Sequence, residues 1–420
     1  MKLRDWPVRY TFLGISFLAC FICFIDRVNI SVAAIAMQDS FGWSDTTKGF
    51  VLSSFFIGYM VFQIPGGWLA DRFGGKKVLG AALIIWSGMT LLTPLAALAG
   101  LPVLYAARIA LGLGEAVSFP SAYSLFSRWA LPDERSRFVA LFTGGIPAGT
   151  LFALITSGWL VAYYGWESVF YIFGAAGIVF AVVWFGLVHN DPRDHPKLTA
   201  KERALFDAHR PAPLDKPKTP WRKLAGLPVF WALIINHFCV DWSFYVLLTW
   251  FPSYFHKAFG VPIVSAGLYS AAPWLVLFVM MHVGAFAADV LIRRGKDVTF
   301  VRKLVQISGL LVASAFLLIA PFAQTSEMAL VIMCVATGGL GVTTAGFAAT
   351  PLDIAPRYAG TVIGVSNTGG TLAGIVGVAL TGWLVDRTGS FDAVWLLCAA
   401  IGVLGAVVWF FFASGEKHVD

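Results

Sequence analysis

Five charged residues lie inside long apolar stretches of this sequence: Asp26, Arg27, Arg108, Glu115 and Asp241. A charged side chain at the centre of a bilayer costs roughly 2.5–3.5 kcal/mol on insertion scales, so such residues usually mark a substrate or proton pathway. Their chemistry would be anion binding by the guanidinium groups and proton exchange by the carboxyl groups. The alternative is a set of buried ion pairs that only locks helices together.

The spacing of these charges suggests how they could act together. Arg108 and Glu115 are seven residues apart, so on a helix they share a face about 10 Å apart, too far for a tight ion pair. Each is therefore expected to find a partner on another helix. Asp26, Arg27, Arg108 and Glu115 sum to zero charge, and Asp241, which we expect to help organise or gate the site, brings the sum to −1. Protonation of one or two carboxylates would free an arginine for an anion and link the two affinities.

Several polar residues at similar depth could bind a hydroxylated substrate or another helix. They are Asn29, on the same face as Asp26, and Tyr59, Gln63, Ser366 and Asn367. His237 and His282 are titratable, but buried histidines of this kind are more typical of packing. Cys20 and Cys23 have a ligand-like spacing, yet no other Cys or His lies close in sequence, so no metal site is expected.

Membrane helices must position these residues. The 420-residue chain is 58% hydrophobic and 13% charged, with mean hydropathy +0.77, which excludes a soluble enzyme or a nucleic-acid binder. The apolar stretches are continuous and do not alternate, which excludes a β-barrel. We expect an all-α membrane protein with about twelve spans, centred near 11–37, 49–70, 79–98, 102–126, 138–162, 168–188, 228–255, 264–288, 303–321, 328–351, 359–385 and 393–413.

The basic residues predict the orientation. With a cytoplasmic N-terminus, the 30 Lys and Arg fall in cytoplasmic segments except for Lys48, Lys257 and Arg387 outside and Arg27 and Arg108 within spans. This bias follows the positive-inside rule, so the net charge of +7 reflects topology and not a nucleic-acid partner. Both termini are expected in the cytoplasm.

A proline-rich polar stretch divides the spans six and six. We predict an N-terminal six-helix bundle at 1–188, a cytoplasmic linker at 189–227 and a C-terminal six-helix bundle at 228–420. Within the linker, Thr199 and Glu202 form a capping box that predicts a short amphipathic helix up to about Arg210.

The two halves repeat a motif. Ser157-Gly-Trp-Leu-Val161 recurs as Thr381-Gly-Trp-Leu-Val385, at the same ordinal span of each half. Parallel six-helix repeats with a site between them are a transporter architecture. No phosphate-binding loop is present, so the driving force should be an ion or solute gradient. The segment Gly67–Lys77 reads as a glycine-rich cytoplasmic loop in which Asp71 and Arg72 act as a gate hinge.

Several motifs occur together and in order along the chain: Asp26-Arg-Val-Asn-Ile-Ser-Val-Ala33, Gln63-Ile-Pro-Gly-Gly67, Gly67–Lys77, Arg108 through Glu115 to Pro120, and Leu352-Asp-Ile-Ala-Pro-Arg-Tyr-Ala-Gly360. On these motifs the whole chain resembles the major facilitator superfamily and, within it, the anion:cation symporter branch. That branch includes vesicular glutamate transporters, sialin, plant plastid anion carriers and bacterial sugar-acid:proton symporters.

The resemblance implies roles for particular residues. Asp26 and Glu115 would be proton-coupling carboxylates, Arg27 would bind substrate, Arg108 would organise or gate the site, and Tyr59 and Asn367 would line it.

This chain also departs from the branch at two places. It has Val240-Asp241 where glutamate transporters carry an arginine, and Ile146-Pro147 where galactonate-type symporters carry a glutamine. A vesicular glutamate or phosphate substrate is therefore not expected, and the pocket should be less polar at Ile146-Pro147 than in a hexonate carrier.

We therefore expect a non-enzymatic, proton-coupled symporter of a small organic anion, such as a sugar acid or aromatic carboxylate, working by alternating access. Alternatives are a proton-antiport exporter, an anion channel or uniporter, and a non-transporting sensor. No cofactor is expected beyond the proton gradient, with protons favoured over sodium. The expected partners are the anion, the proton and the lipid bilayer, with no nucleic acid. We expect a monomer in a bacterial inner membrane.

Overall fold

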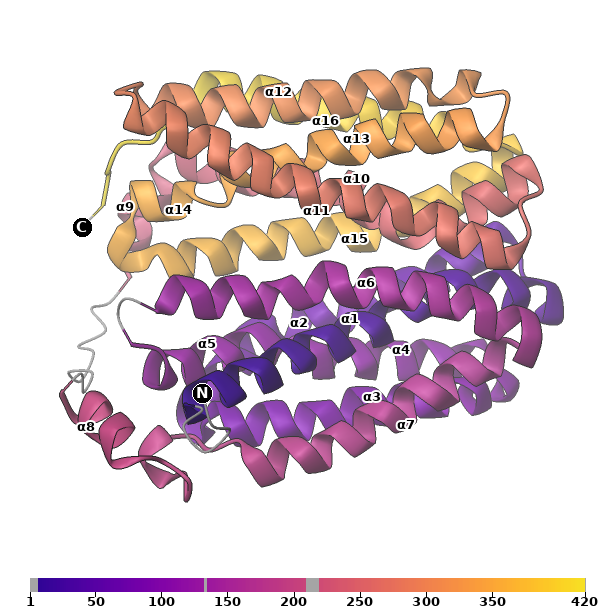
Figure 1. The fold of residues 1–420 in the computed structure, drawn as a ribbon. Coiled ribbons are helices and arrows are strands. Elements are labelled where there is room, and N and C mark those ends of the chain that lie inside the picture. Colours follow the sequence, from indigo (N-terminus) through magenta and orange to yellow (C-terminus); the bar gives the residue numbers. More distant parts are fainter. Residues whose placement is uncertain (1–6, 132–133, 209–218, 420) are drawn as a thin grey trace. The chain divides into compact units, whose positions relative to one another are not determined.

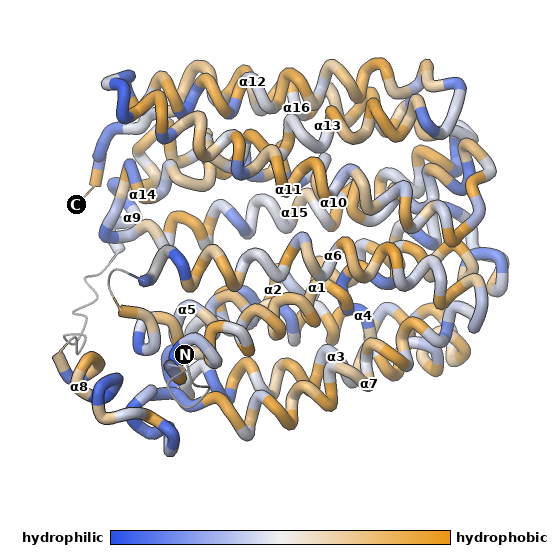
Figure 2. The backbone as a smooth tube through the Cα atoms, viewed as in Figure 1, coloured by the Kyte–Doolittle hydropathy of each residue, from blue (hydrophilic) through white to orange (hydrophobic). Residues whose placement is uncertain are grey.

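The computed structural model describes residues 7–131, 134–208 and 219–419, and every regular element in them is a helix. Twelve of these helical segments are long and apolar enough to cross a membrane, which confirms the predicted fold class and number of spans. Figure 2 shows hydrophobic residues along the helices and hydrophilic residues gathered at helix ends and connections.

The helices of the first half are α1 (Val8–Phe41), α2 (Asp45–Phe73), α3 (Gly75–Ala99), α4 (Leu101–Glu115), α5 (Ser118–Trp129), α6 (Arg135–Tyr164) and α7 (Trp166–Leu187), followed by α8 (Ala200–Ala208) and α9 (Trp221–Ala225). Those of the second half are α10 (Pro228–Phe259), α11 (Ile263–Arg293), α12 (Val298–Ile319), α13 (Ser326–Phe347), α14 (Thr350–Ile354), α15 (Ala359–Thr388) and α16 (Asp392–Phe412). Short 3₁₀ turns are η2 (Pro192–Asp194), η3 (Ala320–Phe322) and η4 (Pro356–Tyr358).

The chain forms two compact units. Unit 1 comprises Met1–Asn29, Ile57–Ala153 and Glu167–Pro217, and unit 2 comprises Ile30–Phe56, Leu154–Trp166 and Lys218–Asp420. Helices α1, α2 and α6 therefore each contribute to both units. In unit 1, α3 packs on α4, and in unit 2, α12 lies beside α13 and α16 (Figure 1). The division into an N-terminal bundle ending at 188 and a C-terminal bundle beginning at 228 stays a prediction.

The repeated motif ends a helix in each half. Backbone N–H groups of Gly165 and Gly389 donate to the carbonyls of Val161 and Val385, at 3.2 and 2.8 Å. The two glycines have φ of +84° and +71°, a conformation that side chains disfavour and that commonly closes a helix. The sequence repeat is thus a repeat of helix termination, at the end of α6 and of α15.

The glycine-rich segment 67–77, predicted as a loop, is helical except at Gly74. Helix α2 continues through Asp71 and Arg72 to Phe73, and the chain turns only at Gly74, whose φ is +87°. At the start of α3, the N–H of Lys76 donates to Asn190 Oδ1 at 2.9 Å. A glycine within a helix weakens it without ending it, so the turn falls where a positive φ is required.

The predicted span 102–126 is broken into two helices. Helix α4 ends at Glu115 and α5 begins at Ser118, shortly before Pro120. The fourth span of the second half breaks similarly, with α13 ending at Phe347 and α14 beginning at Thr350, immediately before a proline. Proline is well tolerated in the first turn of a helix, where its missing N–H needs no partner.

The linker helix begins where predicted, with the threonine half of the capping box formed and the Glu202 carboxylate bonded to α1 instead. Thr199 Oγ1 accepts from the N–H of Glu202 at 3.1 Å, and α8 follows directly. The Glu202 carboxylate accepts from the N–H of Val8 and from Arg9 Nη1, both at 3.1 Å. This contact docks α8 on the start of α1 within unit 1. The predicted helix end at Arg210 lies outside the described residues.

Candidate functional site

The clearest feature of unit 1 is a buried ion pair between α1 and the end of α4. Arg27 Nε donates to Glu115 Oε2 at 2.8 Å, and the two side chains are 7% and 0% exposed. This confirms the prediction that Glu115 finds its partner on another helix. The break in the helix after Glu115 places this carboxylate at the C-terminal end of α4.

Two aromatic rings flank the guanidinium group of this pair. The Cζ atom of Arg27 lies 4.6 Å from the ring centroid of Phe24 and 4.8 Å from that of Tyr59. Cation–π contacts of this kind hold a planar guanidinium in a fixed orientation. Arg27 and Tyr59, both predicted as substrate-binding residues, are thus brought together. Gln63 is half-buried one turn further along α2.

The second predicted coupling carboxylate lies beside this pair in sequence but has its own partner. Asp26 is fully buried, and its Oδ2 accepts from the hydroxyl of Ser87 on α3 at 3.2 Å. Helix α7 approaches closely here, because a Cβ on Gly177 would lie 2.0 Å from Ser87 Oγ. Asp26 and Glu115 therefore sit in different polar surroundings.

Two more predicted residues of unit 1 are buried. Asn29 is fully buried, and its amide atoms make no hydrogen bond within the described part of the chain. Such a group is costly unless something binds it, so it fits a role toward substrate or water. Arg108 is 2% exposed on α4, two turns before Glu115. Asp71 and Arg72 are exposed at the end of α2, where Arg72 lies 5.0 Å from the Trp68 ring.

The predicted residues of the second half belong to unit 2. Asp241 forms a pair with His237 one turn earlier on α10, with 3.5 Å between Oδ2 and Nε2. The other ring nitrogen, Nδ1, lies 3.1 Å from Ser366 Oγ on α15. Asn367 is the next residue on α15 and is half-buried. His282, by contrast, is exposed, and its Nδ1 lies 2.8 Å from the Phe278 carbonyl of its own helix.

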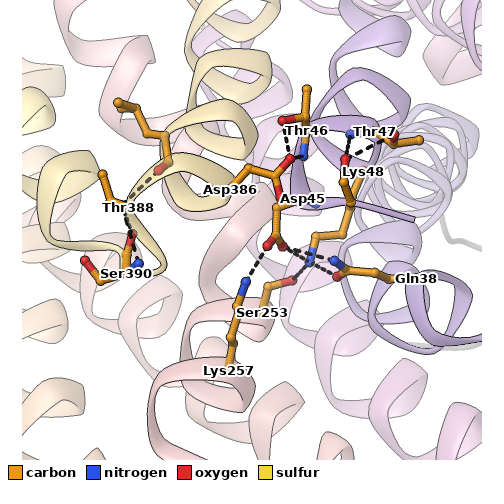
Figure 3. A network of polar contacts seen from close by, with 12 residues as sticks. Gln38, Asp45, Thr46, Thr47, Lys48, Ser253, Lys257, Asp386, Thr388 and Ser390 are labelled. Carbon is orange, nitrogen blue, oxygen red and sulfur yellow. Dashed lines mark hydrogen bonds and ion pairs between the residues drawn. The ribbon is translucent and has the colours of Figure 1, made fainter. Parts of the chain in front are cut away.

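A second polar network of unit 2 joins the start of α2 to the ends of α10 and α15 (Figure 3). The Asp45 carboxylate pairs with Lys48 at 3.4 Å and with Lys257, and Lys48 Nζ also donates to Gln38 and Ser253 at 2.6 and 3.2 Å. Asp386 on α15 accepts from the N–H groups of Asp45 and Thr46 at 3.2 and 3.1 Å, which caps α2.

Sequence reasoning missed this network. Lys48 and Lys257 were two of the three basic residues expected outside, and Asp45 is three residues from Lys48, so a signal was present. Within the described residues, no three His, Cys, Asp or Glu side chains gather as metal ligands.

Comparisons with known proteins agree with this architecture. A family model described as "Major Facilitator Superfamily" matches residues 16–378. Relatives include a probable chloroplastic anion transporter 4 of Oryza sativa subsp. japonica (39% identical, 99% of this chain, 70% of the relative). A chloroplastic ascorbate transporter of Arabidopsis thaliana is 38% identical (99% and 77%), and vesicular glutamate transporter 2 of Homo sapiens is 35% identical (98% and 75%).

Two solved structures share the fold. A bacterial homologue of the human lysosomal transporter Spinster, inward-facing and occupied, gives a TM-score of 0.79 at 20% identity, covering 97% of both chains. A D-xylose-proton symporter gives 0.75 at 18% identity, covering 97% of this chain and 99% of the other.

Proposed function

Because this chain belongs to the Major Facilitator Superfamily, and is an anion transporter of that superfamily and not an enzyme, we propose that it carries a small organic anion together with a proton. The predicted resemblance is confirmed at the level of the family. Proton coupling, the kind of anion and the membrane are the parts that we propose.

The buried ion pair between Arg27 and Glu115 is the observation that carries this proposal. While Glu115 is ionised it occupies the Nε donor of Arg27, at 2.8 Å, inside the protein. Protonation of Glu115 removes its charge and leaves the guanidinium able to bind a substrate carboxylate, which it can do in a bidentate manner. An anion binding to Arg27 in turn raises the tendency of Glu115 to hold its proton. The two ligands therefore favour each other's binding, as symport requires.

The surroundings of Arg27 favour one class of anion. The rings of Phe24 and Tyr59 flank the guanidinium, and the Asn29 amide is buried two residues along α1. A flat or ring-shaped carboxylate with hydroxyl groups, such as a sugar acid or an aromatic acid, would use both the rings and the amide. The names of the relatives include ascorbate, phosphate and glutamate transporters, so these anions belong in the same screen.

The orientation of the chain in the membrane follows from its charge. By the positive-inside rule we place both termini in the cytoplasm and the α1–α2 connection outside. We further propose that the membrane is a bacterial inner membrane. Transport would proceed by alternating access between two six-helix halves. The basic residues near the ends of α2 and α11 would then face the cytoplasm.

The test is uptake by purified protein in liposomes with an acidic exterior. Labelled ascorbate, gluconate, benzoate, glutamate and phosphate are offered in sodium-free medium, and we expect at least one organic acid to accumulate. Uptake only with sodium would contradict proton coupling. Uptake that falls with the inward proton gradient would indicate an exporter, and fast uptake without counterflow would indicate a channel.

The coupling role of Glu115 is tested by Glu115→Gln. This variant should lose proton-driven accumulation by at least about tenfold while it still exchanges labelled for unlabelled anion. The matched control is Asp353→Asn, because Asp353 pairs with Arg302 at the same 2.8 Å in unit 2 and should not affect coupling. Full accumulation by Glu115→Gln would remove Glu115 from the mechanism.

A further inference from the structure

The His237–Asp241 pair, together with Ser366, is a titratable group that the mechanism at Arg27 does not use. All three residues belong to unit 2, on α10 and α15. We propose that they form a second proton-binding site, which takes up and releases one proton. The proposal rests on the proposed proton-coupled function, but its site is separate from Glu115 and can be tested without a transported anion.

A proton can bind between two particular atoms of this pair, Asp241 Oδ2 and His237 Nε2. Asp241 Oδ2 lies 3.5 Å from His237 Nε2, and both side chains are largely buried, 14% and 13% exposed. In the described residues no Lys or Arg forms an ion pair with Asp241. A carboxylate in an apolar helix bundle is stabilised either by a cationic partner or by a proton. Here the imidazole supplies a group that can hold that proton and share it with the carboxylate.

The direction of the Ser366 hydrogen bond depends on how many protons the His237–Asp241 pair holds. Its single hydroxyl hydrogen has two acceptors within reach, the Ile363 carbonyl at 3.1 Å and His237 Nδ1 at 3.1 Å. In the protonated form Nδ1–H donates to the serine oxygen, the hydroxyl donates to Ile363, and one proton is shared by Nε2 and Oδ2. After loss of one proton, Nε2–H donates to the carboxylate and the hydroxyl turns to Nδ1. The charge of the pair changes from zero to −1: the ring loses its proton at Nδ1, and the proton shared with the carboxylate settles on Nε2.

The pair is also in close contact with two other elements. A Cβ on Gly370 of α15 would lie 2.2 Å from Asp241 Oδ2, so the α15 backbone packs directly on the carboxyl group. The Phe347 ring, at the end of α13, lies 4.9 Å from the His237 ring, and the Phe347 N–H is held by Gln306 Oε1 at 3.2 Å. A change of charge at the pair therefore acts directly on two packed elements, the α15 backbone at Gly370 and the break between α13 and α14 at Phe347.

The helices packed on α10 place few other ionisable groups near the pair. On the helix itself Tyr245 follows one turn later, and the Cys239 thiol lies between His237 and Asp241 in sequence. In the described residues the remaining ionisable groups of these helices are Cys334, Cys398 and His282 within spans and, toward helix ends, Arg222, Lys223, Tyr254, His256, Lys257, Tyr269, Asp289, Arg293, Glu327, Asp386, Arg387 and Asp392, together with Asp45 and Lys48 at the start of α2, which contacts the end of α10. The change between the two hydrogen-bond arrangements therefore involves the side chains of His237, Asp241 and Ser366.

The test is ¹⁵N NMR of the histidine rings in the purified full chain in nanodiscs, without substrate. The seven histidines are labelled, and the signal of His237 is identified by its loss in His237→Gln. Between acidic and alkaline pH we expect the His237 ring to change from the form protonated at Nδ1 to the tautomer protonated at Nε2. Ser366→Ala and Asp241→Asn should each abolish this change.

Two controls separate the possible outcomes. Thr368→Ala removes another hydroxyl of α15, one that donates to the Gly364 carbonyl at 3.0 Å, and should leave the change intact. Glu115→Gln should leave it intact as well, so failure of the proposed transport mechanism does not decide this result. A single tautomer of His237 throughout the pH range, or an unchanged response in Asp241→Asn and Ser366→Ala, would overturn the proposal.

Discussion

The ion pairs of Asp45 should keep the start of α2 packed on the end of α10. Replacing Asp45 therefore tests the network in Figure 3. Its side chain is 5% exposed, and its carboxylate is the ion-pair partner of both Lys48 and Lys257. Asp45→Asn keeps the shape and the capacity to accept a hydrogen bond but removes the charge. The Lys48 ammonium group, 2% exposed, then has no carboxylate partner in the network.

The size of the effect follows from the burial of Lys48. Removing one partner of a buried ion pair costs about 3–5 kcal/mol, because the other charge is left desolvated. Lys48 keeps Gln38 and Ser253 as acceptors and lies 4.8 Å from the Trp250 ring, so the low end, about 3 kcal/mol, applies. At about 1.4 kcal/mol for each factor of ten, the closed network should open roughly 100-fold more often.

Amide hydrogen exchange in nanodiscs measures this opening directly, since exchange of locally opened segments follows their free energy. Amides in the first turns of α2 and the last turns of α10 should exchange about 100-fold faster in Asp45→Asn. Lys257→Met is the matched control: its side chain is 43% exposed, so the loss should stay within about 1 kcal/mol, or fivefold.

A double variant separates charge from shape. Asp45→Asn combined with Lys48→Met removes both buried charges, and replacing both partners is often close to neutral. Its exchange should therefore return to within about tenfold of the wild type. Exchange of Asp45→Asn within threefold of the wild type, or equal acceleration in Lys257→Met, would refute the reasoning.

Three further predictions concern other parts of the molecule. Thr199→Ala should cost the start of α8 about 1 kcal/mol, seen as faster exchange of its amides. Gly58→Ala should lower the Tm, because its Cβ would lie 2.0 Å from a backbone oxygen of α4, whereas Gly88→Ala has nothing within 4 Å and should not. Hydrogen bonds from Arg193 hold the pKa of Asp191 below its usual range, so their stabilising contribution is present at neutral pH and is lost as the pH falls below about 4; local exchange at 191–194 measures it.

The twelve helices were predictable because each one needs only a continuous apolar run to satisfy its backbone in a membrane. Their ends were less so. The predicted end of the second span at 70 fell short of Phe73, since the glycines at 66 and 67 fit within a helix and only Gly74 needs a positive φ. The break after Glu115 was missed because α4 and α5 together read as one apolar run.

The contacts between helices depend on how each helix is rotated, which hydropathy does not determine. The i, i+4 spacing of His237 and Asp241 could be read from the sequence, but Ser366, 129 residues later, could not be assigned to the same group. Lys257 meets Asp45 across 212 residues for the same reason. For Glu115, spacing excluded a tight pair with Arg108 and so predicted a partner on another helix, without naming Arg27.

The two units place their ionisable pairs on corresponding elements. In unit 1 the pair joins α1, the first span of its half, to Glu115 at the break of the fourth span. In unit 2 the pair lies on α10, again the first span of its half, and contacts Phe347 at the break of the fourth.

The residues themselves differ: Arg27 with Glu115 carries no net charge when Glu115 is ionised, whereas His237 with Asp241 is neutral only when it holds the extra proton. The two halves therefore share the position of the ionisable pair, next to the break in the fourth span, but not the chemistry of the pair. It follows that removing the proton site of one unit should leave the other able to titrate. Glu115→Gln and Asp241→Asn should then have separable effects, one on the release of Arg27 and one on the tautomer of His237.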